Sequence, residues 1–201
     1  MASLAETRDT ETGNHIQRTQ HYILILAQYL RSIPPYSRHL TDDTIQLMFK
    51  SAPLHDIGKV GVPDTLLKKT GPLTEEESME MKRHIDYGLS AIRKAEQEHG
   101  STEFLNMAKE IVWTHHERWD GSGYPRGLRG DQIPVAGRLM ALADVYDALT
   151  HKRVYKEIYS HQVAMEWIED KRGTHFDPLV VEAFLARELD FLEITERYKD
   201  G

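Results

Sequence analysis

The chain has no cysteine, which excludes both disulfide bonds and metal sites built on thiolates. It also has no apolar run near the ~18–20 residues that a membrane-spanning helix requires, and its longest run, Ile23 to Ala27, fits a helix face. No secretory leader is recognisable, so we expect a cytoplasmic protein without a membrane span.

Basic residues are outnumbered, with 25 Lys and Arg against 32 Asp and Glu, and the net charge is −7. This balance argues against broad binding to nucleic-acid polymers, which requires a basic face. Histidine, in contrast, occurs 11 times. Because thiolates are absent, any metal ligands in this chain must be imidazole and carboxylate groups.

The pattern of apolar residues predicts an all-α fold, a compact domain of several helices. Strand patterns are short and weak. Thr41 and Thr74 are typical helix N-caps, and Thr74 with Glu77 forms a capping-box motif. We expect helices at about Glu11–Arg31, Asp42–Leu54, Glu75–Glu98, Glu103–His115, Val135–Thr150, His161–Lys171 and Pro178–Arg187.

The length of 201 residues suits one domain. We expect an N-terminal tail or truncated linker helix at residues 1–10, the domain at 11–190 and a C-terminal tail at 191–201. The polar start predicts that the chain is the output part of a longer protein. One long irregular stretch, His116 to Pro134, contains four glycines. Loops of this length in a compact helical domain are usually functional.

Histidines and acids occur in pairs whose spacing carries information. Glu11 and His15, four residues apart, share one helix face, as do Asp144 and Asp147, which are three apart. Neighbours on a helix point about 100° apart, so His55-Asp56 and His115-His116 suit two adjacent ions better than one. A carboxylate such as Asp56 can bridge two cations. Taken alone, each pair would more often be a capping or surface pair. Arg18, which belongs to none of these pairs, is expected to be an exposed helix-face charge.

Taken together, the ordered motifs resemble the HD-GYP family within the HD metal-dependent phosphohydrolases. The resemblance covers about residues 9–185. It rests on His55-Asp56-Ile57-Gly58-Lys59, on His115-His116 with the Gly123-Tyr124-Pro125 loop, on Gly127 to Pro134, on Ala143 to Leu149 and on Gly173 to Pro178.

The resemblance implies a role for each matching residue. Asp56 and Lys59 would be catalytic, with Lys59 on the substrate phosphate, and Tyr124, Arg153 and Lys156 would bind substrate. Six residues match the family's two-metal core, namely His55, Asp56, His84, His115, His116 and Asp144. Glu11 and His15 match the pair that holds a third metal in some members, which favours a trinuclear site.

The resemblance also implies an activity. Similar proteins hydrolyse the bacterial second messenger cyclic di-GMP, here to pGpG and on to GMP, with two or three divalent ions. Iron or manganese is favoured, and zinc, cobalt and nickel remain open. We expect a signalling protein such as a response regulator, with an upstream receiver or sensor domain and a homodimer.

Other interpretations remain. The chain could act on mononucleotides, as proteins with only the His-Asp signature do, or on 3',3'-cyclic GMP-AMP. It could also be a catalytically inactive partner-binding module, or a helical structural protein with surface histidines. Metal content separates the structural protein from the others, and a side-by-side assay separates the two cyclic dinucleotides.

Overall fold

A computed structural model describes residues 14–151 and 158–199. Over these residues the protein is all-α, as predicted, with no β-strand and two isolated bridges, Asp120–Arg129 and Arg172–Phe176. The α-helices are α2 (His15–Leu30), α3 (Asp42–Ser51), α4 (Asp64–Leu67), α5 (Glu75–Lys82), α6 (His84–His99), α7 (Glu103–Thr114), α8 (Val135–Thr150), α9 (His161–Asp170), α10 (Pro178–Ala186) and α11 (Glu188–Arg197). Four short 3-10 turns join them, η1 (Tyr36–Arg38), η2 (Ala52–Leu54), η3 (Ile57–Gly61) and η4 (Gly130–Gln132).

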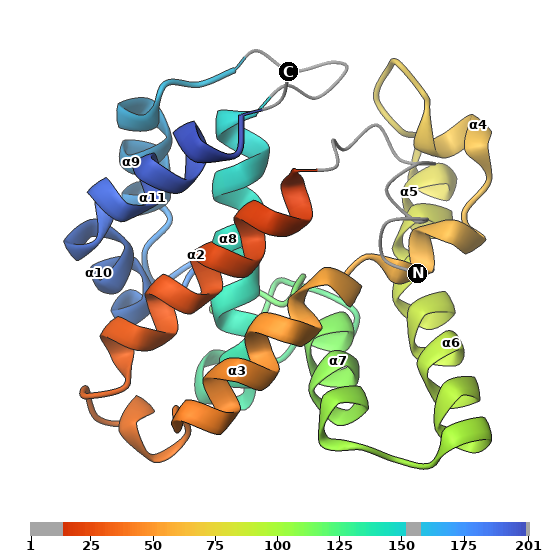
Figure 1. The fold of residues 1–201 in the computed structure, drawn as a ribbon. Helices are drawn as coiled ribbons and strands as arrows, with labels where there is room; N and C mark the ends of the chain where they lie inside the picture. The colour runs from red at the N-terminus through yellow and green to blue at the C-terminus, as the bar shows by residue number, and fades with distance from the viewer. Residues whose placement is uncertain (1–13, 152–157, 200–201) are drawn as a thin grey trace.

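Helix α2 lies at the centre of the main core. It crosses in front of α8, packs on α3, and meets α10 and α11 on its other side (Figure 1). Its residues Ile23, Leu26 and Leu30 are buried at the three- and four-residue spacing that predicted the helix. Both α2 and α8 thus have fixed positions, and each carries candidate site residues.

A smaller apolar cluster joins α6 to α7, with Ile85, Leu89 and Val112 among its buried members. Turn η3 packs tightly on α6, where a Cβ on Gly58 would lie 1.8 Å from the His84 carbonyl oxygen. Only glycine allows this approach. The close packing brings Asp56 and Lys59, on either side of Gly58, against the start of α6.

The single helix expected from Glu75 to Glu98 is wrong in one respect, because the structure breaks it at Arg83 into α5 and α6. The His84 Nδ1 atom bonds to the Met81 carbonyl oxygen at 2.8 Å. A continuous helix would offer that oxygen to the main chain four residues on. The break makes His84 the first residue of α6. The Thr74 capping box at the start of α5 is confirmed.

The expected C-terminal tail at 191–201 is also corrected, because residues up to Arg197 belong to α11. Phe191 is buried and stacks on Tyr22 with ring centroids 4.5 Å apart. The short apolar pattern of this segment gives a weak helical signal, and it is the contact with α2 that buries it.

Within the described residues, no helix combines the length and the apolar character needed to cross a bilayer.

Candidate metal centre

Histidine and aspartate side chains from five parts of the chain meet at one place. His55 and Asp56 lie between η2 and η3, His84 begins α6, and His115 follows the last residue of α7. His15 is the first residue of α2, and Asp144 lies in the second half of α8. Most of these residues lie at helix ends. From there, a side chain can extend past the end of its helix and still remain in the interior of the protein.

The first donor group consists of Asp56, His84, His115 and His116, whose ligand atoms all lie within 4.8 Å of one another. Asp56 Oδ1 lies 3.4 Å from His84 Nε2 and 3.5 Å from His115 Nε2. Four nitrogen and oxygen donors at this spacing can surround a single cation.

The second donor group consists of His15, His55 and Asp144, also within 4.8 Å. His15 Nε2 lies 3.3 Å from His55 Nε2 and 4.0 Å from Asp144 Oδ1. The two groups adjoin at Asp56, because its Oδ2 atom lies 3.3 Å from His55 Nε2 while Oδ1 faces the first group. The two oxygens of Asp56 therefore point toward different donor groups.

Buried polar atoms that make no hydrogen bond indicate that the first donor group suits a cation. Among the described residues, Asp56 Oδ1, His84 Nε2 and His115 Nε2 are buried and accept or donate no hydrogen bond. The Nδ1 atoms of His84 and His115 lie on backbone carbonyls, so the ring proton is on Nδ1 and the Nε2 lone pair faces inward. Leaving such atoms unpaired in the interior is costly, and divalent ions would satisfy them.

The charges in the site agree with this interpretation. Burial alone would raise the pKa of Asp56, but Lys59 and then His55 oppose it and hold that pKa well below its usual value. Burial, reinforced by His115, lowers the pKa of His116 well below its usual value, and burial also lowers that of His84. An ionised Asp56 beside neutral His84 and His116 is the protonation state that metal binding at the first donor group requires.

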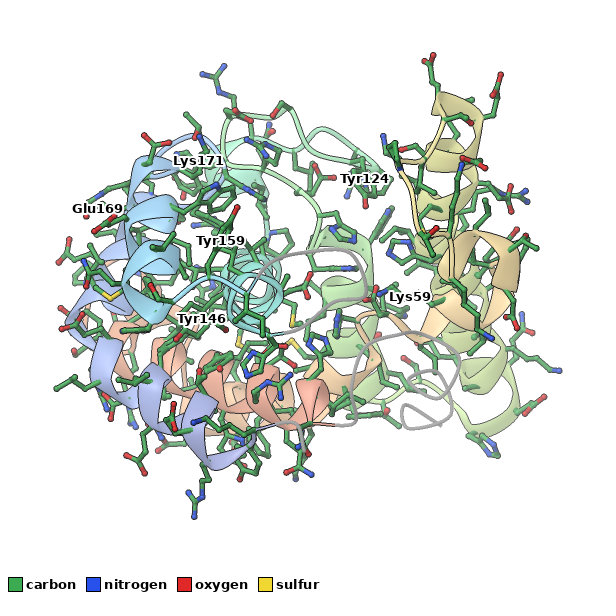
Figure 2. The ribbon with its side chains drawn as sticks, turned by 90° about the horizontal axis from the view of Figure 1, so that it is seen from above. Lys59, Tyr124, Tyr146, Tyr159, Glu169 and Lys171 are labelled. Carbon is green, nitrogen blue, oxygen red and sulfur yellow. The ribbon has the colours of Figure 1, made fainter. Side chains whose placement is uncertain are left out.

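Lys59 and Tyr124 lie on the α6 side of the centre, seen from above in Figure 2. The Lys59 ammonium lies 2.7 Å from Asp56 Oδ2, and its side chain is 15% exposed. Tyr124 stacks on His116 with centroids 4.8 Å apart, and the Lys82 ammonium lies 5.0 Å from its ring centroid. Burial raises the pKa of Tyr124, so it remains a neutral phenol.

The irregular stretch from His116 to Pro134 is built around Glu117, to which the sequence analysis assigned no role. Glu117 is 1% exposed, and its two carboxylate oxygens accept from the N–H groups of Arg126 and Leu128 at 2.8 and 2.9 Å. A Cβ on Gly123 would lie 2.3 Å from the Arg118 nitrogen, so only glycine fits. The sequence did contain a signal, an acidic residue inside a glycine-rich motif. That signal is equally compatible with an acid that binds the loop backbone and with a charge on the surface.

Sequence reasoning also missed the buried ion pair between Arg18 and Asp147. Arg18 is 1% exposed and not the surface charge that was expected, and Asp147 is 3% exposed. Asp147 lies on the same face of α8 as Asp144 but contacts Arg18 and His15 instead of joining a donor group. Helical spacing placed the two acids on one face and could not reveal what each one meets.

Three predicted site residues, Glu11, Arg153 and Lys156, lie outside the described residues. Seven predicted ligands lie inside them, and the structure brings all seven together in the two donor groups.

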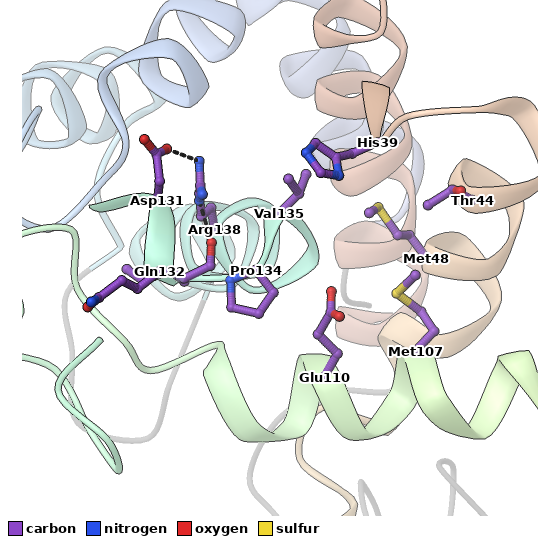
Figure 3. Close-up of a pocket in the computed structure, with 11 residues that line it drawn as sticks. His39, Thr44, Met48, Met107, Glu110, Asp131, Gln132, Pro134, Val135 and Arg138 are labelled. Atoms are coloured by element: carbon purple, nitrogen blue, oxygen red, sulfur yellow. Dashed lines mark hydrogen bonds and ion pairs between the residues drawn. The ribbon is translucent and has the colours of Figure 1, made fainter. Parts of the chain in front are cut away.

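A cavity of about 450 Å³ lies apart from the metal centre, between α3, α7 and the start of α8 (Figure 3). Met48, Met107 and Glu110 form part of its wall, with Val135 and Arg138 opposite. Its described lining includes none of the candidate ligands, so it is separate from the site.

Comparison with known proteins agrees with this picture. The sequence model of a family described as "HD domain" matches residues 14–180. A cyclic di-GMP phosphodiesterase of Vibrio cholerae is 56% identical over 201 residues, 100% of this chain and 41% of that protein. The 3'3'-cGAMP-specific phosphodiesterase 2 of the same organism is 38% identical over 200 residues, 100% of this chain and 36% of that protein. The chain thus spans less than half the length of these relatives.

A solved structure supports the fold. Bd1817, an HDG"Y"P protein from Bdellovibrio bacteriovorus, superposes with a TM-score of 0.60 and 21% identity, covering 89% of this chain and 51% of that one.

Proposed function

We propose, from the premise that the chain belongs to the HD domain family and to its HD-GYP group, that it is a metal-dependent phosphodiesterase of cyclic di-GMP. The single observation that carries the proposal is the pair of donor groups joined at Asp56. The greater identity to a cyclic di-GMP phosphodiesterase than to a 3'3'-cGAMP-specific one favours cyclic di-GMP.

The donor groups would hold divalent ions, and their imidazole and carboxylate ligands suit iron, manganese, zinc, cobalt and nickel alike. The resemblance to the HD-GYP family is what favours iron or manganese. One ion would be held by Asp56, His84, His115 and His116, and another by His15, His55 and Asp144. A third would require Glu11. When bound, such ions supply positive charge to a phosphodiester and lower the pKa of water.

The protein's own groups perform the remaining steps. Asp56 is ionised, and its two oxygens face different donor groups. The size of the carboxylate therefore sets the distance between the two donor groups. The Lys59 ammonium, 2.7 Å from Asp56 Oδ2, would neutralise charge on the substrate phosphate and donate a proton to the leaving oxygen.

The substrate has two phosphates and two bases, so it needs anchors at separate places. Tyr124 offers an aromatic surface beside His116 at one edge of the site. Arg153 and Lys156 would hold the phosphate backbone. We propose that the product is pGpG and that the trinuclear form continues to GMP.

The relatives' greater length supports a regulatory part beyond this chain. We propose an upstream receiver or sensor domain, a homodimer and a cytoplasmic location, in a signalling protein such as a response regulator.

The test is chromatography of the products after anaerobic incubation with iron, manganese or cobalt, using cyclic di-GMP and 3',3'-cyclic GMP-AMP in parallel. We expect cleavage of cyclic di-GMP to pGpG and GMP at the higher rate. No cleavage with any of the three metals would refute the enzyme.

Asp56→Ala should abolish metal binding and turnover while helix content by circular dichroism stays the same. Asp177→Ala is the control, because the Asp177 side chain is even more buried than that of Asp56, at 3% against 14% exposed, but pairs with Arg138, outside both donor groups. Full turnover by Asp56→Ala would show that the bridging role is wrong.

A further inference from the structure

His15 differs from His55, His84 and His115 in what its Nδ1 atom contacts. The Nδ1 atoms of His55 and His84 lie on backbone carbonyl oxygens at 2.9 and 2.8 Å, and that of His115 lies 3.1 Å from two of them. The Nδ1 atom of His15 instead lies 2.8 Å from Asp147 Oδ2. One ligand of the second donor group is therefore backed by a charged carboxylate.

Asp147 is itself held in one orientation. Arg18 donates from Nε to Oδ1 at 2.6 Å and from Nη2 to Oδ2 at 3.0 Å. His151 Nδ1 also lies 3.3 Å from Oδ1. A two-point guanidinium–carboxylate contact fixes direction as well as distance. With both side chains almost fully buried, at 1% and 4% exposed, separating them would leave an unpaired charge in the interior.

The guanidinium also contacts the end of α11. Arg18 Nη1 donates to the Tyr198 carbonyl oxygen at 2.8 Å, and Asn14 Nδ2 donates to that of Lys199 at 2.9 Å. Both bonds tie the C-terminal end of α11 to the first turn of α2, where His15 begins the helix. Arg18 is therefore positioned from two sides.

We propose that Asp147, held by Arg18, is a positioning residue that orients His15 toward the second donor group; this inference rests on the proposed metal centre. A carboxylate at Nδ1 keeps the proton there and directs the Nε2 lone pair toward His55 and Asp144. It also makes the ring a stronger ligand. Metal binding at the first donor group does not depend on Asp147, because none of its members contacts that residue in the described part of the chain.

The test is calorimetric titration of the whole chain with Mn²⁺, comparing wild type, Asp147→Asn and Asp177→Asn. For Asp147→Asn we expect one Mn²⁺ to bind about 10- to 100-fold more weakly while the other is unchanged. The control Asp177→Asn also removes a buried charge beside an arginine, Arg138, and should bind both ions like wild type.

A second variant guards against misfolding, since Asp147→Asn leaves the buried Arg18 charge without its carboxylate. The double variant Arg18→Met/Asp147→Asn removes both charges and should show the same selective loss. Co²⁺ is a further probe, because its visible absorption depends on its ligands. The Co²⁺ spectrum should change in the Asp147 variants and not in Asp177→Asn.

The outcomes separate the proposals. A folded double variant that binds Mn²⁺ with wild-type stoichiometry and affinity would overturn the positioning role, as would an equal loss in Asp177→Asn. Wild type that binds Mn²⁺ but cleaves no cyclic dinucleotide would refute the proposed function and leave this inference standing. Wild type that binds no Mn²⁺ would overturn both.

Discussion

At the scale of single residues, environment gives the histidines different chemistry. His175 lies under the glycine loop, where Trp119 N–H donates to its backbone oxygen and its ring stacks on Phe176 at 4.3 Å. Burial, with the nearby charge of Arg118, lowers the pKa of His175 to about 4. His175 is thus a neutral packing group at physiological pH and, unlike the ligand histidines, belongs to neither donor group.

This predicts how acid acts on the metal-free protein. Unfolded His175 takes up a proton near pH 6.5, whereas the folded ring resists until about pH 4. The unfolded state therefore binds more protons, and stability falls as pH drops through that window. In the wild type, the free energy of urea unfolding should fall between pH 7 and pH 4. His175→Gln should reduce that fall by about 2 kcal/mol, a value discounted because the ring is partly exposed to solvent. An identical pH dependence in the variant would contradict the assignment.

Gly58 allows η3 to reach α6, and its replacement should disturb the site. The added methyl group of Gly58→Ala would fall 1.8 Å from a backbone oxygen that cannot move without shifting His84. We expect a loss of ~3 kcal/mol or more in unfolding free energy, together with weaker metal binding. Gly71→Ala is the control, because no atom lies within 4 Å of a Cβ there. Equal stability of the two variants would refute the close-packing argument.

At the scale of elements, the site depends on where helices end. His15, His84 and His115 lie at or next to helix termini, and the break at Arg83 creates one of these positions. Helix α11 contributes to the site indirectly. It packs on α2, and the Tyr198 carbonyl oxygen at its C-terminal end accepts a hydrogen bond from Arg18. A short helix with little intrinsic stability is held by such packing.

The contribution of α11 can be measured by comparing two of its residues. Phe191→Ala should lower the free energy of urea unfolding by about 3–5 kcal/mol, because its ring is fully buried against Tyr22, Tyr146 and Phe184. Leu189→Ala on the same helix should change it by less than about 0.5 kcal/mol, because Leu189 is 72% exposed. Similar effects from both would mean that α11 does not pack as described.

At the scale of the whole molecule, a net charge of −7 is compatible with an anionic substrate. Asp56 and Asp144 lie inside the donor groups, where bound divalent cations would offset their negative charges. Lys59 adds a positive charge beside Asp56. The overall charge describes the surface, whereas the local charge at the centre decides what binds there.

Metal binding should therefore stabilise the entire fold. Mn²⁺ at roughly 100 times its Kd should raise the melting temperature by about 5–10 °C for each ion bound, because the ligands come together only in the folded chain. EDTA should reverse the shift, and Asp56→Ala should show little of it. A melting temperature that does not respond to Mn²⁺ in wild type would contradict the metal centre.

The amino-acid sequence by itself determined the helical fold, its caps and the residues that form the donor groups. These features depend on local spacing, such as the Thr74 capping box, and on a motif order that spans the chain. Only the tertiary structure decided that Arg18 and Asp147 are buried together behind His15, that Glu117 clamps the loop, and that α11 packs on α2. The physical reason is that periodicity tells which face of a helix a charge occupies, whereas its burial depends on which distant element covers that face.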